Sequence, residues 1–164
     1  MALSGKTSQS YFRNKSKTIM NKDNNISLFA VSFKQGFVSP NVPIATFYQN
    51  GKKLNFLLDS GSDKNVIDKS ILPSITHEIV KGECTCLTGV GGVTKVETCR
   101  VTFSIEKEEY TEDFLIADLT ESFGMIENDH SITLHGIIGS SFLRKNNVVL
   151  DFKNLAAYSR NNQE

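Results

Sequence analysis

The stretch Leu57-Leu58-Asp59-Ser60-Gly61-Ser62 is the most informative segment of the sequence, because an apolar run leads directly into a carboxylate, a hydroxyl and a glycine. The apolar residues predict a buried strand, and Gly61 allows a tight turn directly after it. Asp59 is therefore expected at the end of this strand, where a partly desolvated carboxylate needs hydrogen-bond donors. The alternative is an Asx-turn without a catalytic role, since Asp-Ser-Gly is also common turn chemistry.

Two glycine-containing segments further along the chain help to decide whether Asp59 is catalytic or only part of an Asx-turn. Leu134-His135-Gly136-Ile137-Ile138-Gly139 predicts a second apolar strand that ends in glycine. A brief helix is expected directly after it, over residues 140–145, with Ser140 as its candidate N-cap. Residues 87–93 hold three glycines between strand-like flanks, and they predict either a hairpin tip suited to a moving cover or an ordinary flexible turn.

The rest of the chain is patterned as short strands separated by turns. Asn50-Gly51 lies between two apolar runs and predicts a type I′ hairpin, because this turn needs positive φ at both positions. Closely spaced short strands are typical of an all-β barrel or sandwich. Strands are expected at residues 26–33, 42–48, 53–58, 66–67, 75–80, 84–87, 95–105, 110–117, 148–152 and 155–158, with a short irregular or helical piece at 118–127. The strand at 95–105 is expected to alternate, with one face formed by Val96, Thr98, Arg100 and Thr102 and the other by Glu97, Cys99, Val101, Phe103 and Ile105.

Length and charge limit the classes of protein to which the chain can belong. Its 164 residues suit one folded domain at 26–164, preceded by a polar, flexible arm at 1–25. The 18 basic and 18 acidic residues cancel, which argues against nucleic acid and against a membrane surface as partners. No apolar run is long enough for a membrane span and the N-terminus shows no signal peptide, so we expect a cytoplasmic protein.

Neither cofactor nor metal is expected from the sequence. The three cysteines, Cys84, Cys86 and Cys99, are too few for a disulfide framework and lack the paired spacing of a zinc site. We expect them to be reduced residues that pack like small hydrophobic side chains. The histidines are scattered along the chain, and no Ser-His-Asp arrangement is indicated by spacing.

Taken in order and spacing, the three motifs resemble those of the retroviral-type aspartic proteases (retropepsins) and their cellular relatives. The Asp59-Ser60-Gly61-Ser62 motif follows two apolar residues, the glycine-rich segment comes about 30 residues later, and Ile137-Ile138-Gly139 precedes a short helix. The resemblance covers about residues 28–158. It implies a retropepsin-like acid-protease barrel with one short C-terminal helix, active as a homodimer.

The resemblance also implies roles for individual residues. Because the chain has one Asp-Ser-Gly motif, two copies of Asp59 from two chains would share the catalytic work on a peptide or protein substrate, with Ser60 and Gly61 completing the catalytic motif. Gly139-Ser140-Ser141 stands where viral enzymes have Gly-Arg-Asn, so the bracing of the dimer is expected to differ. The substrate-binding residues implied are Ser62, Asp63, Gly89, Val90, Gly91, Gly92 and Ile138.

Three readings of the sequence remain open at this point. The first is a homodimeric aspartic endopeptidase. The second is a non-catalytic peptide-binding or assembly module on the same fold, because a fold does not fix a function. The third is an unrelated β-barrel in which Asp59-Ser60-Gly61 is only a turn. The hydroxyl of Ser60 directly after the aspartate favours the first reading over the second.

Overall fold

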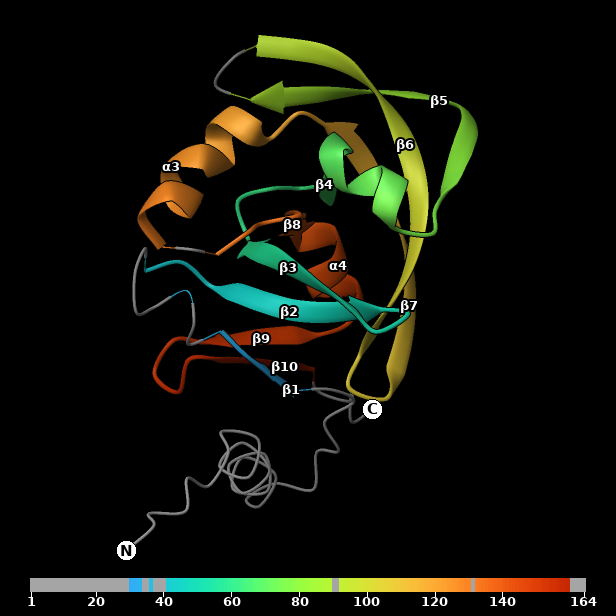
Figure 1. Ribbon diagram of the computed structural model, residues 1–164. Coiled ribbons are helices and arrows are strands. Elements are labelled where there is room, and N and C mark those ends of the chain that lie inside the picture. The colour runs from blue at the N-terminus through green and yellow to red at the C-terminus, as the bar shows by residue number, and fades with distance from the viewer. Residues whose placement is uncertain (1–29, 34–35, 37–40, 90–91, 131, 160–164) are drawn as a thin grey trace, which may run out of the picture.

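The structure, a computed structural model, describes residues 30–33, 36, 41–89, 92–130 and 132–159 (Figure 1). The expected arm at residues 1–25 lies outside the described residues, as do Val90 and Gly91 at the expected hairpin tip. Among the helices that the structure describes, none is long and apolar enough to cross a membrane.

Six strands close into a barrel. The strand order β2-β3-β8-β4-β7-β6 returns to β2 where Tyr48 pairs with Ser104, and β5 is added on the outer edge of β6. A second sheet has the order β1-β10-β9. In chain order the elements are β1 (Ala30–Ser32), β2 (Ile44–Gln49), β3 (Lys52–Asp59), β4 (Val66–Asp68), the 3-10 helix η1 (Lys69–Ser74), β5 (Glu78–Gly89), β6 (Gly92–Ile105), β7 (Glu108–Ala117), α3 (Thr120–His130), β8 (Gly136–Gly139), α4 (Ser140–Lys145), β9 (Val148–Asp151) and β10 (Ala156–Ser159). The all-β prediction is confirmed.

The β2–β3 hairpin forms as the sequence predicts. Asn50 has a φ of 49° and Gly51 a φ of 79°, the positive values at both positions that a type I′ turn needs. The pairing runs from Gln49 with Lys52 to Ile44 with Leu57 without interruption. β3, the second strand of this regular hairpin, ends at Asp59.

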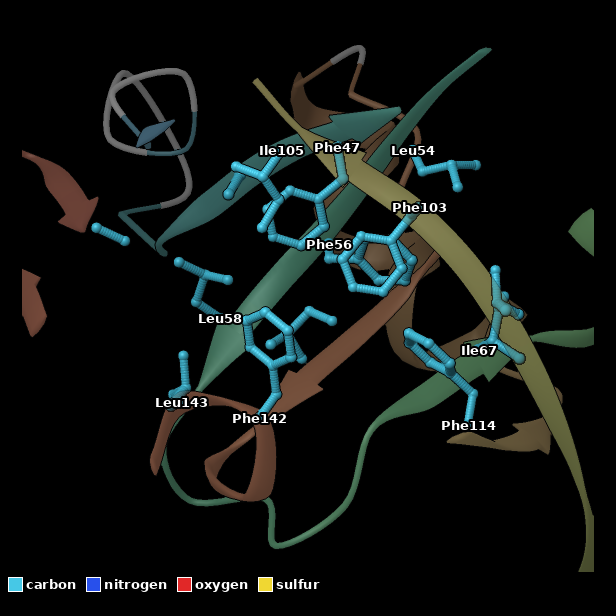
Figure 2. Packing of buried hydrophobic residues seen from close by; sticks show 14 of the residues in the cluster. Phe47, Leu54, Phe56, Leu58, Ile67, Phe103, Ile105, Phe114, Phe142 and Leu143 are labelled. Atoms are coloured by element: carbon cyan, nitrogen blue, oxygen red, sulfur yellow. The ribbon is translucent and has the colours of Figure 1, made fainter. Parts of the chain in front are cut away.

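Phenylalanine side chains from five elements fill the barrel (Figure 2). Phe103 of β6 stacks on Phe47 of β2 with ring centroids 5.3 Å apart, and its ring lies 6.0 Å from that of Phe142 in α4. Phe56 of β3 contacts Phe114 of β7 at 5.6 Å. These distances are within the range at which aromatic rings attract each other beyond their burial. The aromatic core therefore fixes β3, which ends at Asp59, against three other strands and α4.

The predicted alternation along residues 95–105 is also confirmed. Cys99, Val101, Phe103 and Ile105 are buried, whereas Arg100 and Thr102 between them are exposed. Burial raises the pKa of the Cys99 thiol to about 11, so this cysteine stays protonated near neutral pH, as a reduced core residue should. The side chains of Cys84 and Cys86 lie outside the described ones.

Two strands that we expected to be separate, at residues 75–80 and 84–87, are one continuous strand. β5 runs over Glu78–Gly89 and pairs with β6 at both of its ends, with a register shift between Ile79 and Cys84. Extra residues in a bulge are accommodated without ending a strand, which explains the difference. β5 and β6 thereby form one long hairpin that extends beyond the barrel (Figure 1).

Helices are more extensive than the one short C-terminal helix that we expected. That helix, α4, is present, but its N-cap is Gly139 and not Ser140. α3 is a full helix where we expected a short irregular or helical piece. Leu119, Phe123 and Ile126 have helical spacing and pack into a second hydrophobic cluster with residues of β2, β4 and β8.

Candidate active site

The parallel pairing of β3 with β8 places Gly139 directly beside Asp59. The register pairs Phe56 with Gly136 and Asp59 with Gly139, and β4 pairs with the other edge of β8 in antiparallel orientation. A Cβ on Gly136 would lie only 2.3 Å from the carbonyl oxygen of Val66. A glycine at this position therefore allows the three strands to meet where β3 approaches the candidate catalytic carboxylate.

The turn after β3 orients the carboxylate of Asp59. The backbone N–H of Gly61 donates to Asp59 Oδ1 at 2.8 Å, and the N–H of Ser62 donates to the carbonyl of Asp59 at 3.3 Å. Among the described residues, no further hydrogen bond reaches this carboxylate. The Asx-turn is therefore present, and it leaves Asp59 Oδ2 able to interact with another group.

The loop that follows Asp59 is fastened to the end of β8 and the start of α4. The N–H of Ser140 donates to the carbonyl of Ser62 at 2.7 Å, and the Ser62 hydroxyl donates to the carbonyl of Lys64 at 2.8 Å. A Cβ on Gly139 would lie 2.4 Å from the carbonyl oxygen of Lys64. The two segments are in such close backbone contact that a displacement of one displaces the other.

Asn65, which the sequence analysis did not single out, links this loop to two strands. Its side chain is buried, and its Oδ1 accepts a hydrogen bond from the N–H of Gly139 at 2.9 Å. Its Nδ2 donates to the carbonyl of Asp113 in β7 at 3.4 Å, and its own carbonyl accepts from the N–H of Leu115 at 3.0 Å. An asparagine at the entrance to a strand carries no sequence signal of such a role.

Replacing Asn65 with alanine is expected to destabilise the protein by about 1–3 kcal/mol, because the buried N–H of Gly139 loses its acceptor. Urea unfolding curves of the wild type and Asn65→Ala measure this difference. The matched control is Asn154→Ala, which removes an exposed asparagine from the β9–β10 turn and should change the stability by less than about 0.5 kcal/mol. Equal effects of the two substitutions would contradict the role of Asn65.

The predicted site residues from Asp59 to Asp63 lie together on one loop at the surface. Ser60, Gly61 and Asp63 are exposed, and Asp59 and Ser62 are half-buried. Ile138 is fully buried in the main core, in register with Leu58. Its neighbour Ile137 is half-buried and pairs with Leu57, two residues before Asp59. Because side chains alternate along a strand, Ile137 and Leu57 lie on the same face as Asp59.

The structure describes the predicted glycine-rich hairpin only in part. Gly89 ends β5 and pairs with Gly92 at the start of β6. Val90 and Gly91, which connect them, lie outside the described residues. Within the described residues, no group of three or more His, Cys, Asp or Glu side chains is arranged to hold a metal ion.

A family model described as retroviral aspartyl protease matches residues 39–151, which is more than half of the chain. The chain belongs to the retroviral aspartyl protease family. Its barrel has the retropepsin-like fold that the resemblance implied. Membership of this family makes the chain a protease of the aspartic type, and therefore a hydrolase.

Many chains of solved structures also match this chain. EIAV protease in complex with the inhibitor HBY-793 is similar to this retroviral-type protease, with 23% sequence identity, 63% of this chain and 86% of that chain covered, and a TM-score of 0.48. A search of curated proteins finds no match.

Proposed function

We propose that this chain is an aspartic endopeptidase that works as a homodimer, in which two copies of Asp59 activate the water that attacks the peptide bond. The observation that carries the proposal is the half-buried carboxylate of Asp59, held by the N–H of Gly61 at the end of β3 in a chain with one Asp-Ser-Gly motif. One such carboxylate is half of the acid–base pair that peptide hydrolysis requires. A twofold axis beside the exposed Ser60 would supply the other half.

The chemistry follows from two carboxylates that share one proton, since like charges so close together cannot both be ionised. The ionised carboxylate takes a proton from water as the water oxygen bonds to the carbonyl carbon of the substrate. The protonated partner donates its proton to the carbonyl oxygen. When the resulting diol collapses, the C–N bond breaks and the amine leaves with the proton of the protonated carboxyl. The other carboxylate takes a proton from a diol hydroxyl as the carbonyl re-forms, which restores the shared-proton state.

Substrate binding is proposed on the face that carries Asp59. An extended peptide would pair by its backbone with the site loop and with the β5–β6 hairpin, which acts as a cover. Ile138 is not proposed as a substrate contact, because its side chain is buried in the core. We propose instead that Ile137 and Leu57 make the apolar contacts beside the scissile bond. The remaining residues proposed to contact substrate are Gly61, Ser62, Asp63, Gly89, Val90, Gly91 and Gly92.

Specific activity is expected to fall on dilution, because a single chain holds half of the dyad. Initial rates of peptide cleavage are measured over a dilution series, with peptides chosen from a library by their cleavage and with pepstatin as the inhibitor control. Below the dissociation constant of the dimer, the rate should follow the square of the chain concentration, as sedimentation of the same samples should confirm. A monomer that cleaves peptides at constant specific activity would contradict the shared site. A dimer that binds peptides without cleaving them would favour the non-catalytic module.

A further inference from the structure

The imidazole of His135 takes the place of a backbone carbonyl where β8 joins β3. The N–H of Asn55 in β3 donates to His135 Nδ1 at 3.0 Å, and the carbonyl of Asn55 accepts from the N–H of His135 at 2.8 Å. The backbone N–H and carbonyl of Asn55 thus both bond to His135, and one of these hydrogen bonds uses the imidazole, a side chain that can change its charge. His135 lies directly before Gly136, the first residue of β8.

Further hydrogen bonds make this contact a junction of three strands. Asn55 Nδ2 donates to the carbonyl of Thr133 at 2.9 Å, and Asn55 Oδ1 accepts from the hydroxyl of Thr46 at 2.8 Å. The carbonyl of His135 accepts from the N–H of Asp68 in β4 at 2.9 Å. His135 therefore joins β8 to β3 on one side and to β4 on the other.

The hydrogen bond from Asn55 is possible only while the imidazole is neutral. Nδ1 must present its lone pair to the N–H of Asn55, which places the single ring proton on Nε2. A proton on Nδ1 would put two N–H groups head to head and leave the Asn55 N–H without an acceptor. Protonation of His135 therefore opposes the native junction.

The surroundings of His135 also disfavour its protonation. Burial lowers the pKa of His135 below its usual value of 6.5, and the charge of Lys52 acts in the same direction. The backbone contact with Asn55 acts against this shift, as do the carboxylates of Glu127 on α3 and Asp68 on β4. Each of them already accepts a backbone hydrogen bond, Glu127 from the N–H of Leu134 at 2.7 Å and Asp68 from the N–H of Leu119 at 2.7 Å.

We propose that His135 is a positioning residue for catalysis, and that its protonation disables the site by releasing the start of β8 from β3. Gly139, the partner of Asp59, lies four residues further along β8, about 13 Å away at the rise of a strand. The effect reaches Asp59 through the β3–β8 ladder and not by contact. The catalytic part of this inference rests on the proposed function, and the strand-coupling part does not.

The direction of the pH dependence follows from the lowered pKa. Well above pH 6.5 the ring is neutral in both the folded and the unfolded chain, and the contribution of His135 to stability is complete. As the pH falls below 6.5, the unfolded chain takes up the proton first, so the folded state loses stability until the pH has passed the folded pKa. The same uptake of a proton by His135 should reduce kcat/KM at acidic pH.

An NMR titration tests the strand coupling without any need for catalysis. In the wild type, the backbone amide signals of Asn55 and Gly139 should shift with the same apparent pKa as the His135 ring signals. In His135→Asn, which keeps an acceptor at the position of Nδ1 but does not titrate, this inflection should be absent from both amides. An unchanged Gly139 signal through the titration of His135, or an inflection that persists in His135→Asn, would overturn the proposal.

The pH profile of cleavage tests the catalytic consequence. The wild-type kcat/KM should fall about tenfold per pH unit below the pKa of His135, because one proton is taken up, and His135→Asn should lack this component of the fall. His77→Asn is the matched control, since His77 Nδ1 lies 3.3 Å from the carbonyl of Ile75 and outside the β3–β8 junction. Identical acid limbs in the wild type and His135→Asn would contradict the positioning role. Coupled amide signals in a wild type that cleaves no peptide would support the coupling and reject the proposed function.

Discussion

Asp59→Asn is expected to abolish peptide hydrolysis while leaving the fold intact. The amide Oδ1 can still accept the hydrogen bond from the N–H of Gly61, so the turn should be preserved. An amide can neither take a proton from water nor donate one as a carboxylic acid does, and general acid–base catalysis contributes about 10²–10⁴-fold to a rate. Initial rates on a cleaved peptide, with circular dichroism and unfolding curves on the same samples, measure both expectations.

Mixing the inactive variant with the wild type extends this test to the shared site. An excess of Asp59→Asn chains should inhibit the wild type, because mixed dimers hold a single carboxylate. Asp113→Asn is the matched control, since Asp113 lies at the surface in an ion pair with Arg100 and should neither lose activity nor inhibit. Wild-type rates in a correctly folded Asp59→Asn variant would reject Asp59 as the catalytic carboxylate.

Gly139→Ala is expected to destabilise the protein strongly and to reduce activity further than the loss of stability explains. The added Cβ would lie 2.4 Å from the carbonyl oxygen of Lys64 and 2.9 Å from that of Ser62. Both contacts are with backbone atoms, which cannot rotate away as a side chain can. Relief requires the loop after Asp59 to move, and such overpacking costs about 1–3 kcal/mol or more. Urea unfolding and kcat/KM on the folded fraction separate the two effects.

Gly124→Ala provides the control for this substitution. Gly124 lies within α3, and a Cβ there would meet no atom within 4 Å. Alanine is favoured over glycine inside a helix, so this variant should be more stable than the wild type by up to about 1 kcal/mol. A Gly139→Ala variant as stable and as active as Gly124→Ala would show that the loop does not depend on close packing against β8.

Local sequence patterns predicted those parts of the fold that depend on near neighbours. The Asn50-Gly51 turn and the alternation that buries Cys99, Val101 and Phe103 each follow from a few adjacent residues, and both are confirmed. The site loop was predictable for the same reason, since Asp59, Ser60 and Gly61 form a local turn. In each case the pattern and the hydrogen bonds that it predicts lie within one segment.

Other features could not be predicted because they depend on contacts between distant segments. The amide of Asn65 acquires its role only when Gly139 is placed beside it, and His135 is one of three scattered histidines until β8 docks on Asn55. The helical spacing of Leu119, Phe123 and Ile126 was visible in the sequence, but Gly124 within the same segment weakens the helix signal. The stability of α3 comes from the second hydrophobic cluster, against which the helix packs.

The insertion of β8 between β3 and β4 has a consequence for how the protein folds. β3 and β4 are neighbours in the chain, but the strand that separates them arrives late, and the contact of Asn55 with His135 spans 80 residues. The search for such a distant partner is slow, because the entropy of closing the loop is lost before any contact forms. During synthesis, the first 130 residues would leave β3 and β4 with open facing edges, which are prone to pair with other chains. Completion of the C-terminal part is therefore both the step that assembles the site and the step that removes an aggregation hazard.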